Sequence, residues 1–287
     1  MKLSSRPLSN SPGDAATKKR QWVKPALIGG VFVYLALFLY IPTLNVFATA
    51  FGDGIIPFLH TLTEPDFVHA AKLTLLAALI AVPLNTIFGL CAAWAIARHK
   101  FPGRALLLSI LDLPFSVSPV VAGLMLVLLY GRNGWFGPLL QNLNIQVIFA
   151  FPGIVLATMF ITLPFVAREV IPALEEAGFD QDEAAKTLGA NEWQTFWRVT
   201  VPTIRWSLLY GVILTNARAM GEFGAVAVVS GNLVGRTQTL ALFVEEAYKQ
   251  YQTRAAFAAA VVLTFLALIT LVLKEILERK TRIKDVE

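Results

Sequence analysis

The sequence predicts an all-α polytopic membrane protein with six transmembrane helices. Hydrophobic residues make up 56% of the 287-residue chain and charged residues only 15%, a balance far from that of soluble proteins. The apolar residues are gathered into runs of roughly 20 or more, long enough to cross a bilayer as helices. Lys and Arg cluster beside these runs, as they do on the cytoplasmic side of membrane proteins.

The same pattern explains the formal net charge of +5, so the charge does not indicate a nucleic-acid partner. Cys91 is the single cysteine, which excludes an intramolecular disulfide and a cysteine-rich metal site. The closest approach to a phosphate-binding P-loop, residues 231–237, is one residue short and has Arg in place of Lys. We therefore expect no enzyme, no cofactor and no bound metal. The histidines are scattered over different segments: His60, His69 and His99.

The N-terminal 24 residues are polar and end in a basic cluster, and they predict a disordered cytoplasmic tail. An apolar run over 26–51 follows. Residues 48–50 (Ala-Thr-Ala) imitate a signal-peptidase site, but the run is about twice the length of a signal-peptide core. We expect a retained first span, followed by an external segment over 52–67 that has no Lys or Arg.

Basic clusters also orient the spans that follow. A second span is expected over 70–96, a short external segment over 131–144, and a fourth span over 146–170 that leads into a cytoplasmic loop over 171–202. The cytoplasmic cluster after the second span consists of Arg98, His99, Lys100 and Arg104.

Residues 105–131 mix apolar residues with Asp112, Pro114 and Pro119. Proline interrupts helices, so we divide this stretch into a membrane-proximal part that ends near Phe115 and a third span beyond it.

The rest of the chain predicts a fifth span over 204–230, an external segment over 231–254 and a sixth span over 255–273. The whole membrane domain is expected over 25–274, and a basic cytoplasmic tail over 275–287. Both termini therefore lie inside the cell.

The polar loop before the fifth span, residues 176–202, has the local sequence of two short helices joined by a turn. Asp180 is expected to cap the first helix, with Glu three residues later, and Gly189 to end it in the left-handed conformation. Asn191 is expected to cap the second helix, which Pro202 closes. A DNA-binding helix-turn-helix has a similar sequence, but here the flanking runs are long enough to cross a membrane.

Polar residues interrupt the middle of the fifth span. A charge that faces lipid at mid-membrane costs at least ~2.5–3.5 kcal/mol on insertion scales, so Asn216, Arg218 and Glu222 should face protein or water. Arg218 and Glu222 lie one helical turn apart and can pair. Two interpretations stay open: a structural ion pair between helices, or the border of a permeation path. A ladder of small residues suits close helix packing: Ala217, Gly221 and Ala225.

The stretch before the third span offers further candidates for such a path. Asp112 is interpreted as an interfacial residue or helix cap, with a place in the path as the alternative. Ser116 and Ser118 would put hydroxyl groups near the path, and Pro119 a kink.

The polar loop carries a long motif that resembles a known family. Its residues agree at every spacing with EAA-x3-G-x9-I-x-L-P, the motif of permeases of ATP-binding-cassette importers, with Val at the two aliphatic positions. The resemblance implies a type I importer permease fold, in which this loop forms a cytoplasmic coupling helix that docks into a groove on a separate ATPase subunit. An ordinary loop between spans is the alternative. The matching residues are Glu183, Ala184, Ala185, Gly189, Val199, Val201 and Pro202.

Four other stretches resemble the W-type permease subunits of sulfate/thiosulfate importers. Similarity extends from about residue 30 to the last span. Related molybdate permeases share the Gly-Glu-Phe-Gly string, so the combination of stretches, and not that string, favours sulfate. The stretches are 111–124 (LDLPFSVSPVVAGL), 134–140 (GWFGPLL), 163–178 (LPFVAREVIPALEEAG) and 214–231 (LTNARAMGEFGAVAVVSG).

The resemblance also implies partners and a mechanism. The chain would pair with a homologous T-type permease in the bacterial plasma (inner) membrane, with two ATPase subunits beneath and a periplasmic sulfate-binding protein that delivers sulfate or thiosulfate. Transport would proceed by alternating access driven by ATP. The alternatives are a molybdate or tungstate permease of the same class and, in a different class, a secondary transporter driven by an ion gradient.

Overall fold

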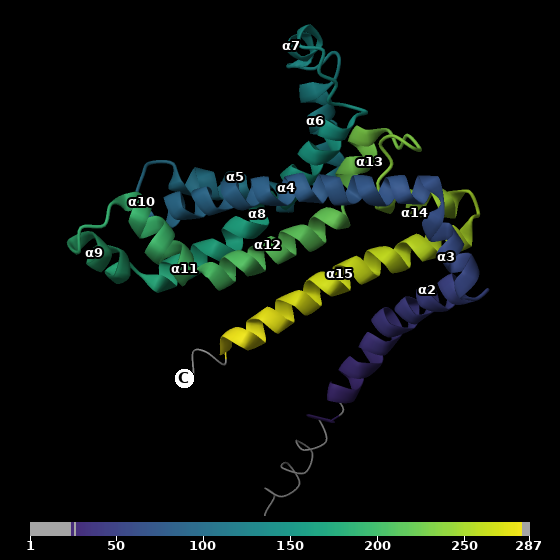
Figure 1. The fold of residues 1–287 in the computed structure, drawn as a ribbon, viewed down its shortest axis with the longest axis horizontal. Coiled ribbons are helices and arrows are strands. Elements are labelled where there is room, and N and C mark those ends of the chain that lie inside the picture. The colour runs from purple at the N-terminus through teal and green to yellow at the C-terminus, as the bar shows by residue number, and fades with distance from the viewer. Residues whose placement is uncertain (1–23, 26, 283–287) are drawn as a thin grey trace, which may run out of the picture. The chain divides into compact units, whose positions relative to one another are not determined.

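The computed structural model describes residues 24, 25 and 27–282, and every element assigned within them is a helix (Figure 1). The predicted N-terminal tail, apart from Lys24, lies outside the described residues, as do residues 283–287. The chain divides into two compact units, residues 1–52 and 53–287. Within the described residues four helices are long and apolar enough to cross a membrane, and six spans result if each of two bent helix pairs counts as one.

The first unit contains the apolar helical run Leu27–Phe51, of 25 residues. At 1.5 Å per residue this run is about 37 Å long, enough to cross a hydrocarbon core of about 30 Å. A π-helical turn, η1 (Ala36–Tyr40), precedes α2 (Ile41–Phe51), whose first turn contains Pro42. Such a local widening is a common adjustment where proline removes a helical hydrogen bond. The predicted first span is a helix in all its described residues.

Two long helices, α4 (Pro65–Arg98) and α8 (Phe151–Ala177), pack side by side as the centre of the second unit (Figure 1). A Cβ atom on Gly89 would lie 2.8 Å from Cβ of Val166, so only glycine permits this approach. The buried Asn85 amide donates to the carbonyl oxygen of Met159 at 2.9 Å and to Oγ1 of Thr162 at 2.8 Å. Close backbone contact and a buried amide therefore hold these spans together.

The third span is broken. α5 (Arg104–Ser116) and α6 (Pro119–Tyr130) meet at 112°, because the backbone of Val117 and Ser118 is extended, as the residue before proline prefers. The predicted break after Phe115 is confirmed. The prediction that a whole span lies beyond it is wrong, since the 12 residues of α6 measure about 18 Å and fall short of the bilayer core.

The fifth span is also bent: α12 (Arg205–Met220) and α13 (Gly224–Ser230) meet at 53°. The two breaks lie against each other. A Cβ atom on Gly224 would lie 2.8 Å from Cβ of Pro119, and one on Gly123 would lie 2.8 Å from the carbonyl oxygen of Ala225. The second halves α6 and α13 therefore pack closely on each other (Figure 1).

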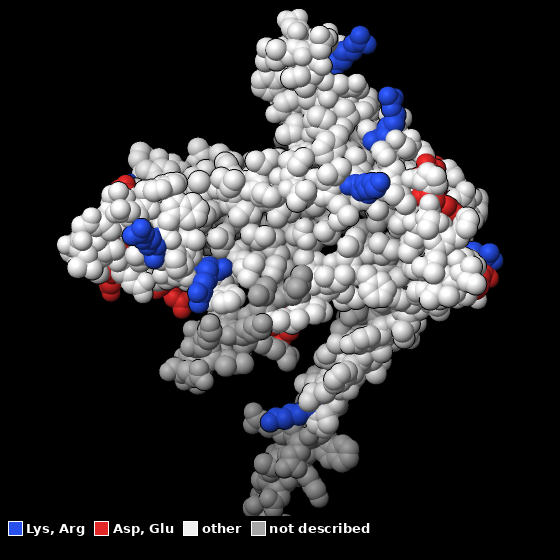
Figure 2. Space-filling view, in the orientation of Figure 1, with Lys and Arg blue, Asp and Glu red and all other residues white. Residues whose placement is uncertain are grey.

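Shorter helices occupy the segments predicted to be external, and charged side chains gather mainly towards the ends of the long helices on the visible face of the second unit (Figure 2). The last span, α15 (Thr253–Arg282), is helical well beyond the predicted end at residue 273. The fourth span begins later than predicted because Phe149, with φ of +60°, reverses the chain before α8. The short helices are α3 (Ile55–Thr63), α7 (Gly137–Asn142) and α14 (Leu240–Lys249).

Candidate functional site

The first helix of the polar loop is α9 (Asp180–Thr187), and Gly189 ends it as predicted. Gly189 has φ of +89°. Its N–H donates to the carbonyl oxygen of Lys186 at 3.0 Å, and the N–H of Ala190 donates to that of Ala185 at 3.1 Å. These two bonds form a Schellman motif, which satisfies the last carbonyl groups of the helix.

The start of α9 differs from the prediction. Phe179 occupies the N-cap position and Asp180 is the first helical residue, with no side-chain hydrogen bond that caps the helix. The prediction that Asp180 caps α9 together with Glu183 is therefore wrong. Gly178, with φ of +65°, turns the chain one residue earlier, so the acidic side chains fall inside the first turn. They still interact favourably with the positive end of the helix dipole.

The second helix, α10 (Glu192–Thr195), begins with the predicted capping box. Oδ1 of Asn191 accepts from the N–H of Gln194 at 2.8 Å, and Oε1 of Gln194 accepts from the N–H of Asn191 at 3.0 Å. Two otherwise unsatisfied N–H groups are thus bonded, and the entry into α10 is fixed by local sequence alone.

Pro202 does not close this helix, contrary to the prediction. The chain continues from α10 through a π-helical turn, η2 (Phe196–Thr200), into α11 (Val201–Thr203), where Pro202 lies in the first turn. The π-helical turn directly before Pro202, in which the N–H of Val201 donates to the carbonyl oxygen of Phe196, is the kind of local adjustment found where proline interrupts a continuing helix. The bend comes at Ile204, just before α12.

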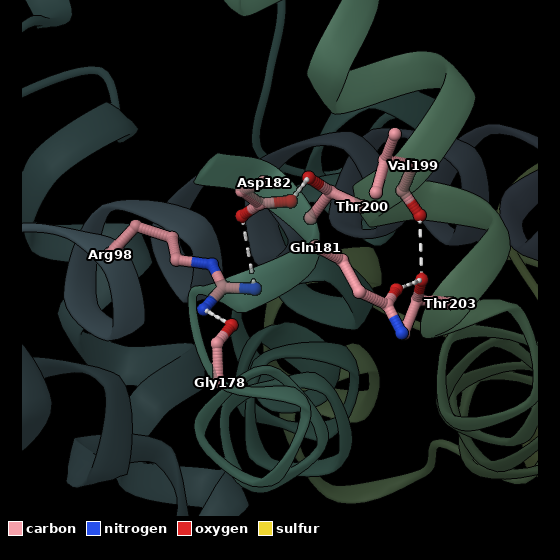
Figure 3. A network of polar contacts seen from close by, with 7 residues as sticks. All are labelled: Arg98, Gly178, Gln181, Asp182, Val199, Thr200 and Thr203. Atoms are coloured by element: carbon pink, nitrogen blue, oxygen red, sulfur yellow. Dashed lines mark hydrogen bonds and ion pairs between the residues drawn. The ribbon is translucent and has the colours of Figure 1, made fainter. Parts of the chain in front are cut away.

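A buried polar network attaches α9 to the rest of the second unit (Figure 3). Nη2 of Arg98, at the end of α4, lies 3.1 Å from Oδ2 of Asp182, and the two side chains are only 7% and 13% exposed. Oδ1 of the same carboxylate accepts from the hydroxyl of Thr200 at 3.1 Å. Nη1 of Arg98 donates to the carbonyl oxygen of Gly178, and the guanidinium carbon lies 4.8 Å from the centre of the Phe179 ring.

A second contact joins α9 to the helices that follow it. The hydroxyl of Thr203 lies 3.0 Å from Oε1 of Gln181 and 2.7 Å from the carbonyl oxygen of Val199 (Figure 3). Next to this network is a cavity of about 150 Å³ lined by Trp94, Phe196 and Lys186, among others. One side of α9 is therefore attached both to α4 and to the segment that follows the loop.

The opposite side of the loop is open to solvent and carries apolar side chains. Leu188 is 89% exposed and Trp193 70% exposed. Glu183 and Ala184 of the three-residue motif are also exposed, whereas Ala185 is half-buried. This combination of apolar and acidic groups on a rigid pair of helices is typical of a surface that binds another protein.

The predicted pair in the fifth span is present at the bend between α12 and α13. Nη1 of Arg218 lies 2.7 Å from Oε2 of Glu222, whose side chain is 1% exposed against 35% for Arg218. Oε1 of Glu222 accepts from the N–H of Ala225 at 2.9 Å, so the carboxylate also satisfies the first turn of α13. Asn216 is not part of this group: it lies beside Met220 and lines a separate surface cavity with Lys72.

The small-residue ladder predicted in this span does not form. The helix ends at Met220, and Gly221 is exposed, with only the carbonyl oxygen of Ala217 within 4 Å of an added Cβ. Ser116 and Ser118 are exposed at the break between α5 and α6. Pro119 at this break lies against Gly224 at the break of the fifth span. The structure therefore brings the two serines and the ion pair to neighbouring breaks.

Asp112 forms a two-point contact with a residue that the sequence analysis did not single out. Oδ1 of Asp112 accepts from Nε of Arg168 on α8 at 2.9 Å. Oδ2 lies 2.8 Å from Nη2 of the same arginine. The Arg168 guanidinium carbon also lies 5.2 Å from the centre of the Phe115 ring. Asp112 lies inside α5 and is thus not a helix cap, and its charge is paired with that of Arg168. An arginine in a membrane-spanning helix is the signal that points to such a pair.

Residues 85–283 match the family described as binding-protein-dependent transport system inner membrane component. The chain belongs to this family. The permease is therefore a multi-pass inner-membrane subunit of an ATP-binding-cassette transporter.

Named relatives and solved structures agree with this assignment. The permease is 64% identical over 259 residues to the sulfate transport system permease protein CysW of Synechocystis sp., which covers 90% of this chain and 94% of that protein. It is 41% identical over 210 residues to the sulfate transport system permease protein CysT of Escherichia coli, and the matched region covers 73% of this chain and 76% of that protein. A crystal structure of a bacterial alginate ABC transporter matches with a TM-score of 0.75 at 18% identity, over 92% of this chain and 96% of that one. The type I permease fold is confirmed.

Proposed function

We propose that this permease is the W-type membrane subunit of an ATP-driven sulfate importer. The observation that carries the proposal is the 64% identity, over nine-tenths of the chain, to a protein named as a sulfate transport permease. The substrate does not follow from the geometry, because the buried Glu222 lies beside Arg218 and offsets the charge that would attract an anion. Thiosulfate belongs to the same proposal, since it is also a divalent tetrahedral oxyanion.

The partner in the membrane is proposed to be a T-type permease. The similarity to CysT supports two homologous permeases, each forming one half of the membrane part. Two ATPase subunits would bind on the cytoplasmic side, and a periplasmic binding protein would deliver the anion on the other side. Both termini would lie in the cytoplasm, and the basic clusters beside the spans support this orientation.

The contact with the ATPase is assigned to α9 and the turn after it. Glu183, Ala184 and Leu188 are exposed there, while the opposite side of the helix is fastened by buried polar contacts. A helix that is rigid on one side and exposed on the other is suited to transmit a displacement. Closure of the ATPase dimer on ATP would push α9 and convert the membrane part between outward-open and inward-open states.

The path of the anion is assigned to the neighbouring breaks of α5–α6 and α12–α13. Interrupted helices expose backbone groups inside the membrane, which is tolerated where they line a protein cavity or water. Ser116, Ser118 and the partly exposed Arg218 lie at these breaks, with Glu222 behind them. Asn216 faces the separate cavity beside Lys72, and its place in the path depends on the partner subunit.

The test is uptake by proteoliposomes that contain this permease with its T-type partner, the ATPase and the binding protein. We expect uptake of radiolabelled sulfate that needs both ATP hydrolysis and the binding protein, and competition by thiosulfate. Stronger competition by molybdate or tungstate would reassign the substrate. Uptake driven by an ion gradient without the ATPase would replace the proposal with a secondary transporter.

A further inference from the structure

Arg98 joins parts of the permease that are distant in the sequence. It is the last residue of α4, and its side chain crosses to the segment that begins after α8 (Figure 3). There it contacts the carbonyl oxygen of Gly178, the ring of Phe179 and the carboxylate of Asp182 in α9. Through Asp182 the network extends to Thr200 in η2. One guanidinium group thus links α4 to both ends of the coupling loop.

The covalent chain gives α4 no direct attachment to α9. The loop that contains α9 is continuous with α8 on one side and with α12 on the other, whereas α5, α6 and α7 separate it from α4 in the sequence. α4 nevertheless packs against α8, α12 and α14. The loop is linked to α8 and α12 through the chain itself. A contact between α4 and α9 therefore links a third long helix to the loop.

Burial distinguishes this pair from a neighbouring one at the same end of the molecule. Arg104 and Glu175 are 2.8 Å apart but 43% and 50% exposed, whereas Arg98 and Asp182 are 7% and 13% exposed. Exposed pairs are screened by solvent and hold their partners weakly. A buried pair resists separation, because either charge left alone would remain without water.

The two terminal nitrogens of Arg98 each hold a different point of the loop. Nη1 donates to the carbonyl oxygen of Gly178, and Nη2 lies 3.1 Å from Oδ2 of Asp182. The guanidinium therefore fixes the orientation between α4 and α9 at two points.

We propose that Arg98 is a positioning residue that fastens α4 to α9, so that α4 moves with the coupling loop when the ATPase closes. The planar guanidinium is suited to this task, because it holds two acceptors at a set angle, which the single point charge of lysine does not. The inference rests on the proposed docking of α9 to the ATPase.

The experiment measures sulfate molecules imported per ATP hydrolysed in proteoliposomes that contain the complete transporter. Arg98→Lys and Asp182→Asn are compared with Arg104→Gln, which removes a charge at the same cytoplasmic end from an exposed pair. We expect the import ratio of the first two to fall by about 2- to 30-fold, the range found for residues that carry coupling between sites, while the ATPase stays bound. Arg104→Gln should keep the parental ratio.

A purely structural pair would give a different result. Thermal stability would fall in Arg98→Lys and Asp182→Asn, but the surviving complexes would import sulfate at the parental ratio, and that outcome overturns the proposal. Loss of the ATPase from these variants would also overturn it, because Arg98 would then shape the docking surface. The variant Gly189→Val distinguishes a wrong role for Arg98 from a wrong assignment of α9. If the ATPase stays bound and coupled to transport in Gly189→Val, α9 is not the docking element.

Discussion

Glu222 contacts two neighbours at the bend of the fifth span. One carboxylate oxygen lies 2.7 Å from Arg218, and the other accepts the N–H of Ala225 at 2.9 Å. The side chain is almost wholly buried, so its charge depends on these two partners. The pair of Glu245 and Lys249 has the same spacing in the sequence but is far more exposed, with side chains 33% and 64% accessible. These two pairs allow burial to be tested at constant spacing.

Glu222→Gln and Arg218→Gln should each destabilise the solubilised permease more than Lys249→Gln does. Breaking a buried ion pair from one side costs ~3–5 kcal/mol in soluble proteins, and less where water reaches the remaining charge. Lys249→Gln breaks an exposed pair that solvent screens, so it should have little effect on stability. The measurement is the thermal unfolding midpoint in detergent, with the amount of assembled transporter as a second readout. The double variant of Arg218 and Glu222 should recover part of the loss. Parental stability in both single variants would show that the buried pair contributes nothing.

At the scale of helices, close contact between α4 and α8 depends on a single glycine, Gly89. Gly89→Ala should destabilise the permease, because the new Cβ would lie 2.8 Å from a β-branched neighbour, Val166, in a packed interface. Overpacking of this kind costs about 1–3 kcal/mol. Gly221→Ala is the matched control, since its Cβ has only one atom nearby, at 3.8 Å. The comparison uses unfolding midpoints, and equal stabilities would contradict the observed packing.

The turn after α9 gives a second prediction at this scale. A Cβ atom added at Gly189 meets nothing within 4 Å, so the φ of +89° is what opposes substitution there. Gly189→Val should cost about 1–3 kcal/mol locally and weaken ATPase binding, whereas Gly189→Asn should be milder, because Asn adopts this conformation more readily. Co-purification of the ATPase and sulfate uptake provide the measurement, with membrane extraction as the control for folding. Normal uptake with a fully retained ATPase in Gly189→Val would remove α9 from the coupling role.

Local sequence predicted the end of α9, the start of α10 and the positions of the apolar runs, because each of these features has a local cause. The left-handed Gly189 and the capping box at Asn191 depend on residues within one turn, and the apolar runs are long enough to locate the spans. The partners of Arg98 and Asp112 were not predicted. Each of these contacts joins helices that are far apart in the sequence, and only the packed bundle brings their side chains together. The bend at Gly221 was missed because small residues also suit an uninterrupted helix.

At the scale of the whole molecule, the order of the spans sets which segments face each side of the membrane. Single cysteines at Thr63 and Val234, in a Cys91→Ser background, should react in intact cells with a thiol reagent that does not cross membranes. Both residues are exposed in segments predicted to be external. Val234 suits the test better than Asn232, whose side chain bonds to Glu246 and Gln238.

The control for this labelling is a cysteine at Glu176, which is exposed at the end of α8 in the predicted cytoplasmic loop. It should react only after the cells are opened, because the basic clusters place this loop inside. Reaction at Glu176 from outside in sealed cells would reverse the orientation. Protection at either external position would require a different number of spans.

The close fit between α6 and α13 has a consequence for biosynthesis. Gly123 and Gly224 seat these two half-helices on each other, yet α6 leaves the ribosome long before α13 has been translated. At about 5–20 residues per second, the first half-helix waits several seconds in the membrane for its counterpart. During that interval α6, too short to cross alone, must be shielded by the insertion machinery or by the partner permease. A nascent chain stalled after α8 should therefore be a substrate for membrane quality-control proteases, whereas one stalled after α13 should persist.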